Sequence, residues 1–152
     1  MKLRLDQQEK KLDELFNMVQ AVSDEEIKAY LSKFLCIRTS GLLENALKGL
    51  LLEFVHGSSP QQVENYIGKS IRSLTNLKDE KIEYCLKSFS DEWHAKFCAK
   101  ISEEQRSALN SVVTNRNNIA HGEVDNLTFK MMEGYYFKVK EVIQLLKIII
   151  KK

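Results

Sequence analysis

The stretch Ser102–Gly122, SEEQRSALNSVVTNRNNIAHG, contains the start and the end of one helix and, in its last third, a group of chemically reactive side chains. It opens with a capping box, in which Ser102 and Gln105 satisfy each other's backbone N–H groups. It closes on Gly122, a residue suited to the left-handed conformation just beyond a helix. The spacing predicts a helix over residues 102–121.

One side chain in this helix does not suit its position. At ~100° per residue, Arg116 falls near the middle of the apolar face. That face consists of Leu109, Val112, Val113, Ile119 and Ala120. A buried Arg is costly unless it is paired or opens onto a polar site. Two interpretations follow: an ion pair in the core, or an anion-binding group in an active site or subunit interface.

His121 is the second reactive group of this stretch. In a regular helix it lies ~140° round from Arg116, so the two side chains do not share a face. They converge only if the helix ends near Ala120, which Gly122 favours, or if two chains meet across a two-fold axis. From physics alone, a His before a Gly is more often a helix cap than a catalyst.

The rest of the chain also predicts helices, because it has only one Pro and six Gly and no strand-like alternation. Apolar periodicity and capping signals predict helices over residues 4–21, 23–35, 39–56, 61–74, 78–89, 90–101 and 127–149. Whether the second and third form one helix is left open. Ser23 and Ser59 are the expected caps, with Pro60 at a first helical position. The predicted fold class is all-α.

At 152 residues, with 43% hydrophobic and 29% charged residues, the chain predicts one globular domain over residues 1–152. The N-terminal helix, residues 1–22, would be peripheral to it or would contribute to a dimer. The net charge of +2 excludes a histone-like nucleic-acid binder. We find no signal peptide and no membrane-spanning run, so we expect a soluble, cytoplasmic protein with no membrane partner.

The cysteines and the other histidines suggest no metal site. Cys36, Cys85 and Cys98 are odd in number and lack CxxC spacing, which indicates reduced, packed thiols. We expect no zinc site, because we find no Cys/His pair with the spacing of zinc ligands. His56 is interpreted as a residue at a helix end, and His94 as a surface or half-buried histidine. We therefore expect no metal and no cofactor.

The segment Arg116–His121, RNNIAH, resembles the R-x(4–6)-H signature of the HEPN superfamily, in which a polar residue such as Asn117 commonly follows the Arg. The form RNxIAHG most resembles the minimal bacterial HEPN groups, such as the RiboL-PSP type and the MAE_28990 type. An upstream apolar helix bearing Ser40 and Glu44 and a long downstream helix extend the resemblance over about residues 29–150.

The resemblance implies an antiparallel helical bundle, usually a homodimer whose two motifs face each other in one cleft. It also implies a metal-independent endoribonuclease that cleaves RNA through the ribose 2′-OH. In that enzyme His121 would act as general base or acid, and Arg116 would stabilise charge on the phosphate oxygens. Asn117 would position the phosphate or the histidine.

Three further residues are candidates for binding or orienting the substrate: Ser40, Glu44 and Asn118. Glu44 could reach and orient Arg116, or it could form an ordinary exposed pair with Lys48 one turn away. Glu123 stands where HEPN partners of minimal nucleotidyltransferases usually carry Tyr, which argues against regulation by adenylylation of such a residue.

Two functions follow from the resemblance. The first is a ribonuclease acting as a toxin or defence effector, with an antitoxin or another partner protein. The second is a non-catalytic HEPN dimer that binds RNA or a protein.

Overall fold

The structure is a computed structural model that describes residues 2–151, and α-helix is the only extended regular element in this range. The helices are α1 (Lys2–Gln20), α2 (Glu25–Val55), α3 (Gln61–Arg72), α4 (Asp79–Phe89), α5 (Asp91–Lys100), α6 (Glu103–Ala120) and α7 (Phe129–Ile149). This confirms the all-α prediction. Within these residues, no helix combines the length and the apolar character needed to cross a bilayer.

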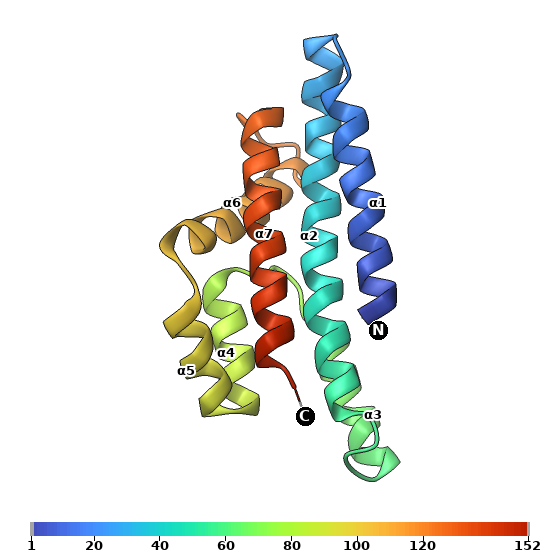
Figure 1. Cartoon of the computed structure of the whole chain (residues 1–152), viewed down its shortest axis with the longest axis vertical. Coiled ribbons are helices and arrows are strands. Elements are labelled where there is room, and N and C mark those ends of the chain that lie inside the picture. Colours follow the sequence, from blue (N-terminus) through green and yellow to red (C-terminus); the bar gives the residue numbers. More distant parts are fainter. Residues whose placement is uncertain (1, 152) are drawn as a thin grey trace.

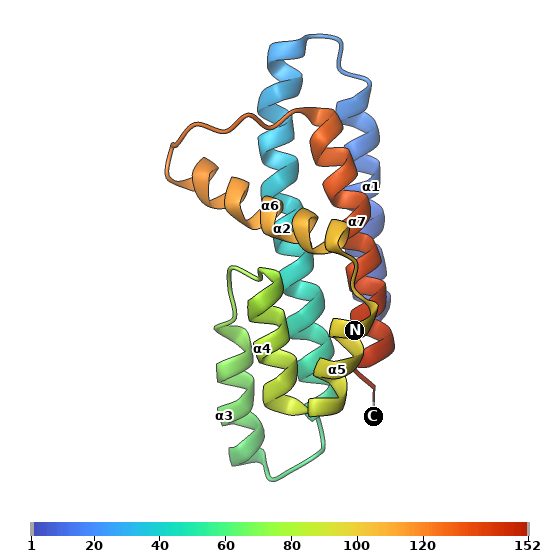
Figure 2. The ribbon, with the colours of Figure 1, turned by 90° about the vertical axis from the view of Figure 1, so that its left-hand side faces the viewer.

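Three long helices, α1, α2 and α7, lie side by side, and α1 runs antiparallel to the other two (Figure 1). Side chains fix α1 against α7. Lys140 lies 3.0 Å from the carboxylate of Asp13, which also accepts a hydrogen bond from the hydroxyl of Tyr136. The ring of Phe16 stacks on that of Tyr136 at a centroid distance of 4.2 Å. The remaining long helix, α6, lies crosswise over α2 and α7 (Figure 2).

The core draws side chains from all seven helices. The N-terminal helix belongs to it, because Leu5, Leu12 and Phe16 are almost completely buried. The prediction of packed thiols holds for Cys36 and Cys85 but is wrong for Cys98, which is exposed. Position 98 follows the buried Phe97 and so points off the core-facing side of α5.

The segment from Glu25 to Val55 is a single continuous helix of 31 residues, which settles the question left open at residues 39–41. The hydroxyl of Thr39 donates to the backbone oxygen of Leu35 at 2.8 Å, so this polar group is satisfied without interrupting the helix. As a result, residues before and after Gly41 keep one helical phase.

The helix caps follow the predictions at one site and differ at two. Ser102 forms the expected capping box at the start of α6. At the start of α2, Asp24 is the cap instead of Ser23, because its carboxylate accepts from two backbone N–H groups, at 3.0 and 3.1 Å. At the start of α3, Pro60 occupies the cap position itself, with extended ψ of 149°, and Ser59 makes no capping bond. Each difference is a shift of one residue.

Candidate functional site

The RNNIAH motif occupies the last turns of α6. The first part of this helix is anchored in the core by Ala108, Leu109, Val112 and Val113. Its C-terminal end extends beyond α2 toward the surface (Figure 2). The helix therefore holds the motif on a rigid support while leaving its end accessible.

The helix ends where the sequence predicts, in a Schellman motif. Gly122 adopts a left-handed conformation, with φ of 68°. Its N–H donates to the oxygen of Ile119 at 3.2 Å, and the N–H of Glu123 donates to the oxygen of Asn118 at 2.8 Å. These two bonds satisfy carbonyl groups at the helix end and turn the chain sharply after His121.

Arg116 is half-buried, and its guanidinium has a neutral neighbour. Nη1 donates to Oδ1 of Asn117 at 3.2 Å. In the part of the chain that the structure describes, no carboxylate forms an ion pair with Arg116. The core ion pair considered from the sequence is therefore not formed, and the charge is left available to an anion.

His121 is the C-cap residue of α6, and its side chain is exposed. Its backbone N–H donates to the oxygen of Asn117 at 3.0 Å. Within residues 2–151 no hydrogen bond links His121 to Arg116. The helix ending predicted at Ala120 is thus present, but it does not by itself bring the two side chains into contact.

Glu44 and Ser40 lie on α2, and among the described residues neither is hydrogen-bonded or ion-paired to the motif. The carboxylate of Glu44 accepts a hydrogen bond from Thr75 at 3.3 Å, and no ion pair of Glu44 with Arg116 or Lys48 is found among the described residues. Ser40 is buried, with 5% exposure. The hydrogen bond that Glu44 makes is thus to the loop after α3 and not to Arg116.

Asp125 is a further residue of this region, in the loop between α6 and α7. Its side chain is only 3% exposed and lies 3.3 Å from Nζ of Lys33 on α2. It also accepts from the N–H of Leu127 at 3.3 Å. The loop after His121 is therefore tied to α2. The sequence signal for this arrangement was the Asp itself, because an Asp side chain often accepts from the backbone N–H two residues on, as in an Asx turn.

Cys36 lies where α2 packs against α6, the helix that carries the motif. Burial raises the pKa of the Cys36 thiol to about 12, with Asp125 contributing to the rise and Arg116 opposing it. The thiol lies 3.5 Å from the backbone oxygen of Val112, to which it donates. Cys36 is therefore protonated and unreactive, and Arg116 and Asp125 act on the same short segment of α2.

An exposed apolar stripe runs along α2 at this level. Its members recur at helical spacing and are Ile27, Tyr30, Phe34 and Ile37, which are 52%, 63%, 43% and 42% exposed. Lys33, which holds Asp125, comes from the same two turns. In the loop itself Val124 is 85% exposed. Apolar surface therefore lies uncovered near the loop that follows the motif.

The residues that could hold a metal ion lie elsewhere, on α4 and α5. Glu83, His94 and Cys98 bring one ligand atom each to within 4.8 Å of one another. The expectation that no Cys/His pair has ligand spacing is wrong here, because His94 and Cys98 are four residues apart in one helix and so share a face. Arg116 and His121 take no part in it.

The family model for RiboL-PSP-HEPN matches residues 3–152, and the chain therefore belongs to this family of the HEPN superfamily. No curated protein and no solved structure matches the chain. HEPN domains are typically ribonucleases.

Proposed function

We propose that this RiboL-PSP-HEPN protein is a metal-independent endoribonuclease whose site is formed by Arg116, Asn117 and His121. The observation that carries the proposal is the half-buried Arg116, which has no carboxylate partner in the described chain and lies close in sequence to an exposed imidazole. A guanidinium in this state can bind a phosphate through two parallel hydrogen bonds.

The reaction follows from these groups. His121 removes the proton from a ribose 2′-OH, and the 2′ oxygen attacks the adjacent phosphorus. The bond from phosphorus to the 5′ oxygen breaks, and this oxygen receives a proton from an imidazolium. Arg116 stabilises the charge on the non-bridging oxygens. Asn117 holds Arg116 in place through the bond to Nη1. DNA is not cleaved, because it lacks the attacking hydroxyl.

We further propose that two chains form the complete site, as a homodimer. Arg116 and His121 of one chain are not hydrogen-bonded to each other, whereas the exposed stripe on α2 offers apolar surface for a second copy beside the motif. An uncovered stripe next to a charged, accessible motif is the arrangement expected of an interface that also contains a site. Arg116 of one chain would then bind the phosphate, while His121 of the other removes the proton of the 2′-OH or protonates the leaving 5′ oxygen.

The first test is cleavage of single-stranded RNA in the presence of EDTA. Wild-type protein is expected to cleave RNA and leave DNA of the same sequence intact. Arg116→Ala and His121→Ala should each lose activity by about 10²-fold or more while keeping their helical circular dichroism. Cleavage that persists in both variants, or that requires added metal, would contradict the proposal.

The second test is mixing the two inactive variants. If each site takes Arg116 from one chain and His121 from the other, a mixed dimer contains one intact site, and activity returns on mixing. If both residues act within one chain, mixing restores nothing. Phe34→Lys on the exposed stripe should weaken the dimer and the activity together, as measured by light scattering and cleavage.

A non-catalytic dimer that binds RNA or a protein is the alternative. Its support is the position of His121, whose backbone caps α6 and whose side chain is not held in a catalytic pair. It predicts RNA binding without cleavage by the pure protein.

A role as a toxin or defence effector, with an antitoxin or other partner, is part of the ribonuclease proposal. It would show as growth arrest that requires both Arg116 and His121.

A further inference from the structure

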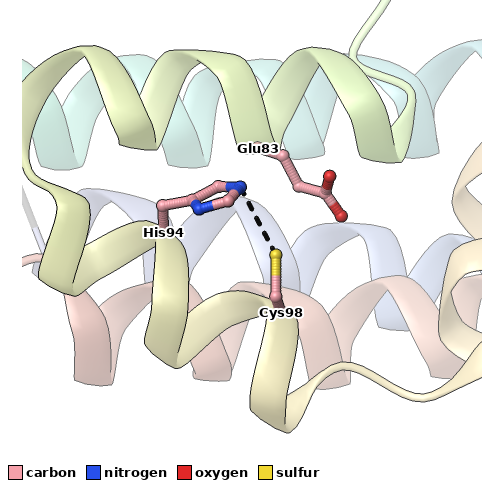
Figure 3. A group of neighbouring side chains, drawn as sticks. All are labelled: Glu83, His94 and Cys98. Carbon is pink, nitrogen blue, oxygen red and sulfur yellow. Dashed lines mark hydrogen bonds between the residues drawn. The ribbon is translucent and has the colours of Figure 1, made fainter.

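Three potential metal ligands meet at the surface between α4 and α5. Glu83 comes from α4, while His94 and Cys98 lie one turn apart on α5 (Figure 3). Nε2 of His94 lies 3.5 Å from Sγ of Cys98, and all three ligand atoms fall within 4.8 Å of one another. The carboxylate of Glu83 points toward the same space from the opposite helix (Figure 3).

The spacing of the ligand atoms of His94 and Cys98 fits a tetrahedral ion. Zn²⁺ binds thiolate at ~2.3 Å and imidazole at ~2.0–2.1 Å. At a tetrahedral angle these two bonds place sulfur and nitrogen ~3.6 Å apart, close to the 3.5 Å found between Cys98 and His94. A helix places residues four apart on one face, so the pair is preformed by the secondary structure of α5.

The chemistry of the ligands selects the class of metal. A thiolate and an imidazole favour Zn²⁺ and related transition metals, whereas Mg²⁺ and Ca²⁺ prefer oxygen ligands only. The side chain of Glu83 is 21% exposed and Cys98 is exposed, so an ion can reach the site from solvent. With three protein ligands, a water molecule would complete the tetrahedron.

Arg106 competes with a metal ion for the carboxylate of Glu83. Its Nη1 donates to Oε1 of Glu83, but it also donates to Asp79 at 3.0 Å. The second oxygen of Glu83 can therefore bind an ion while Arg106 keeps its partners on α4. This geometry would link α5 to α4, and through Arg106 to α6.

We propose that Glu83, His94 and Cys98 bind one Zn²⁺ ion that clamps α4 to α5. The clamp stands apart from the proposed ribonuclease site, because its three residues lie on different helices from Arg116 and His121. It stabilises the fold by binding the folded chain alone. At free Zn²⁺ of about 100 Kd, the ratio of folded to unfolded protein should rise ~100-fold.

The test uses the full chain after removal of metals with a chelator. Titration with Zn²⁺ by calorimetry should give one ion per chain, and Co²⁺ in its place should show a thiolate-to-cobalt charge-transfer absorption band. Zn²⁺ should also raise the Tm. Glu83→Gln, His94→Ala and Cys98→Ser should each weaken binding by more than about tenfold. In Cys98→Ser the charge-transfer band should disappear.

The controls are Cys36→Ser and His56→Gln, which alter the same residue types away from α4 and α5. Both should bind Zn²⁺ as wild type does. No saturable binding by the wild-type chain, or binding that survives in His94→Ala and Cys98→Ser, would overturn the proposal. RNA cleavage is measured separately in EDTA, so failure of the zinc site would leave the ribonuclease proposal unaffected, and the reverse also holds.

Discussion

The two ends of α6 each carry an arginine, and the two differ in whether a carboxylate neutralises the charge. Arg106 forms ion pairs with Asp79 and Glu83 on α4, and its side chain is 19% exposed. Arg116, ten residues and about 15 Å further along the helix, has only the amide of Asn117 as a hydrogen-bond partner in the described chain.

This difference separates a structural charge from an available one. Carboxylates that approach from another helix fix Arg106 and neutralise it, so it contributes to packing. The amide of Asn117 orients Arg116 without neutralising it. Arg116 therefore retains the capacity to bind an anion, and the C-terminal end of α6 is the end to which we assign function.

The largest effect is expected from exchanging each arginine for lysine. Arg116→Lys keeps the charge but loses the planar fork that binds a phosphate at two points, so RNA cleavage should fall by about 10²-fold. Arg106→Lys should leave cleavage per folded molecule unchanged. If both variants lose activity equally at matched folded fractions, the assignment of function to Arg116 and of a structural role to Arg106 is wrong.

The second prediction concerns stability. Arg106→Ala leaves Asp79 and Glu83 close together without their cation, and the free energy of unfolding should fall by about 2 kcal/mol, a value reduced for partial exposure. Arg116→Ala should change it by less than about 1 kcal/mol, because no ion pair is lost. Urea unfolding of both variants and wild type measures the difference. An equal loss in both variants would make Arg116 a structural residue.

The acid dependence of stability gives an independent measure of the same ion pairs. Burial tends to raise the pKa of Asp79, but hydrogen bonds from Arg106, Asn110 and the backbone of Glu80 hold it below its usual value. The stabilisation is therefore complete above the ordinary Asp pKa of about 3.9 and is lost as the pH falls through the lower folded value. In Arg106→Ala this loss of stability below about pH 4 should be smaller.

The smallest effect is expected at the turn that ends α6. Gly122→Ala forces a left-handed conformation on a residue with a Cβ, which costs about 1 kcal/mol although no atom lies within 4 Å of the added carbon. The matched control is Gly134→Ala in α7, where the space is equally open and the helical backbone should gain about 0.5–1 kcal/mol. Thermal unfolding of the pair should show shifts of opposite sign.

The end of α6 was predictable because its determinants lie within a few residues of each other. The capping box at Ser102 and the left-handed Gly122 both act through neighbouring backbone groups. The apolar periodicity that placed Arg116 on the core-facing side of α6 is also local. For the same reason the RNNIAH motif could be recognised without any knowledge of how the helices pack.

Other features depend on contacts between distant segments and could not be read from local patterns. Glu44 was a plausible partner for Arg116, but its carboxylate accepts a hydrogen bond from Thr75, 31 positions away in the sequence. The burial of Asp125 against Lys33 joins residues that are 92 positions apart. Local propensity contains no information about which helices meet or at what level.

The sequence by itself determined the all-α class, the two ends of α6 and the position of Arg116 on its inward face, because each is set by backbone geometry and apolar spacing over one or two turns. Only the tertiary structure decided that Arg106 is paired while Arg116 has no carboxylate partner in the described chain, and that Glu83 meets His94 and Cys98. The physical reason is that the state of a charge depends on which groups other helices bring within a few ångströms of it.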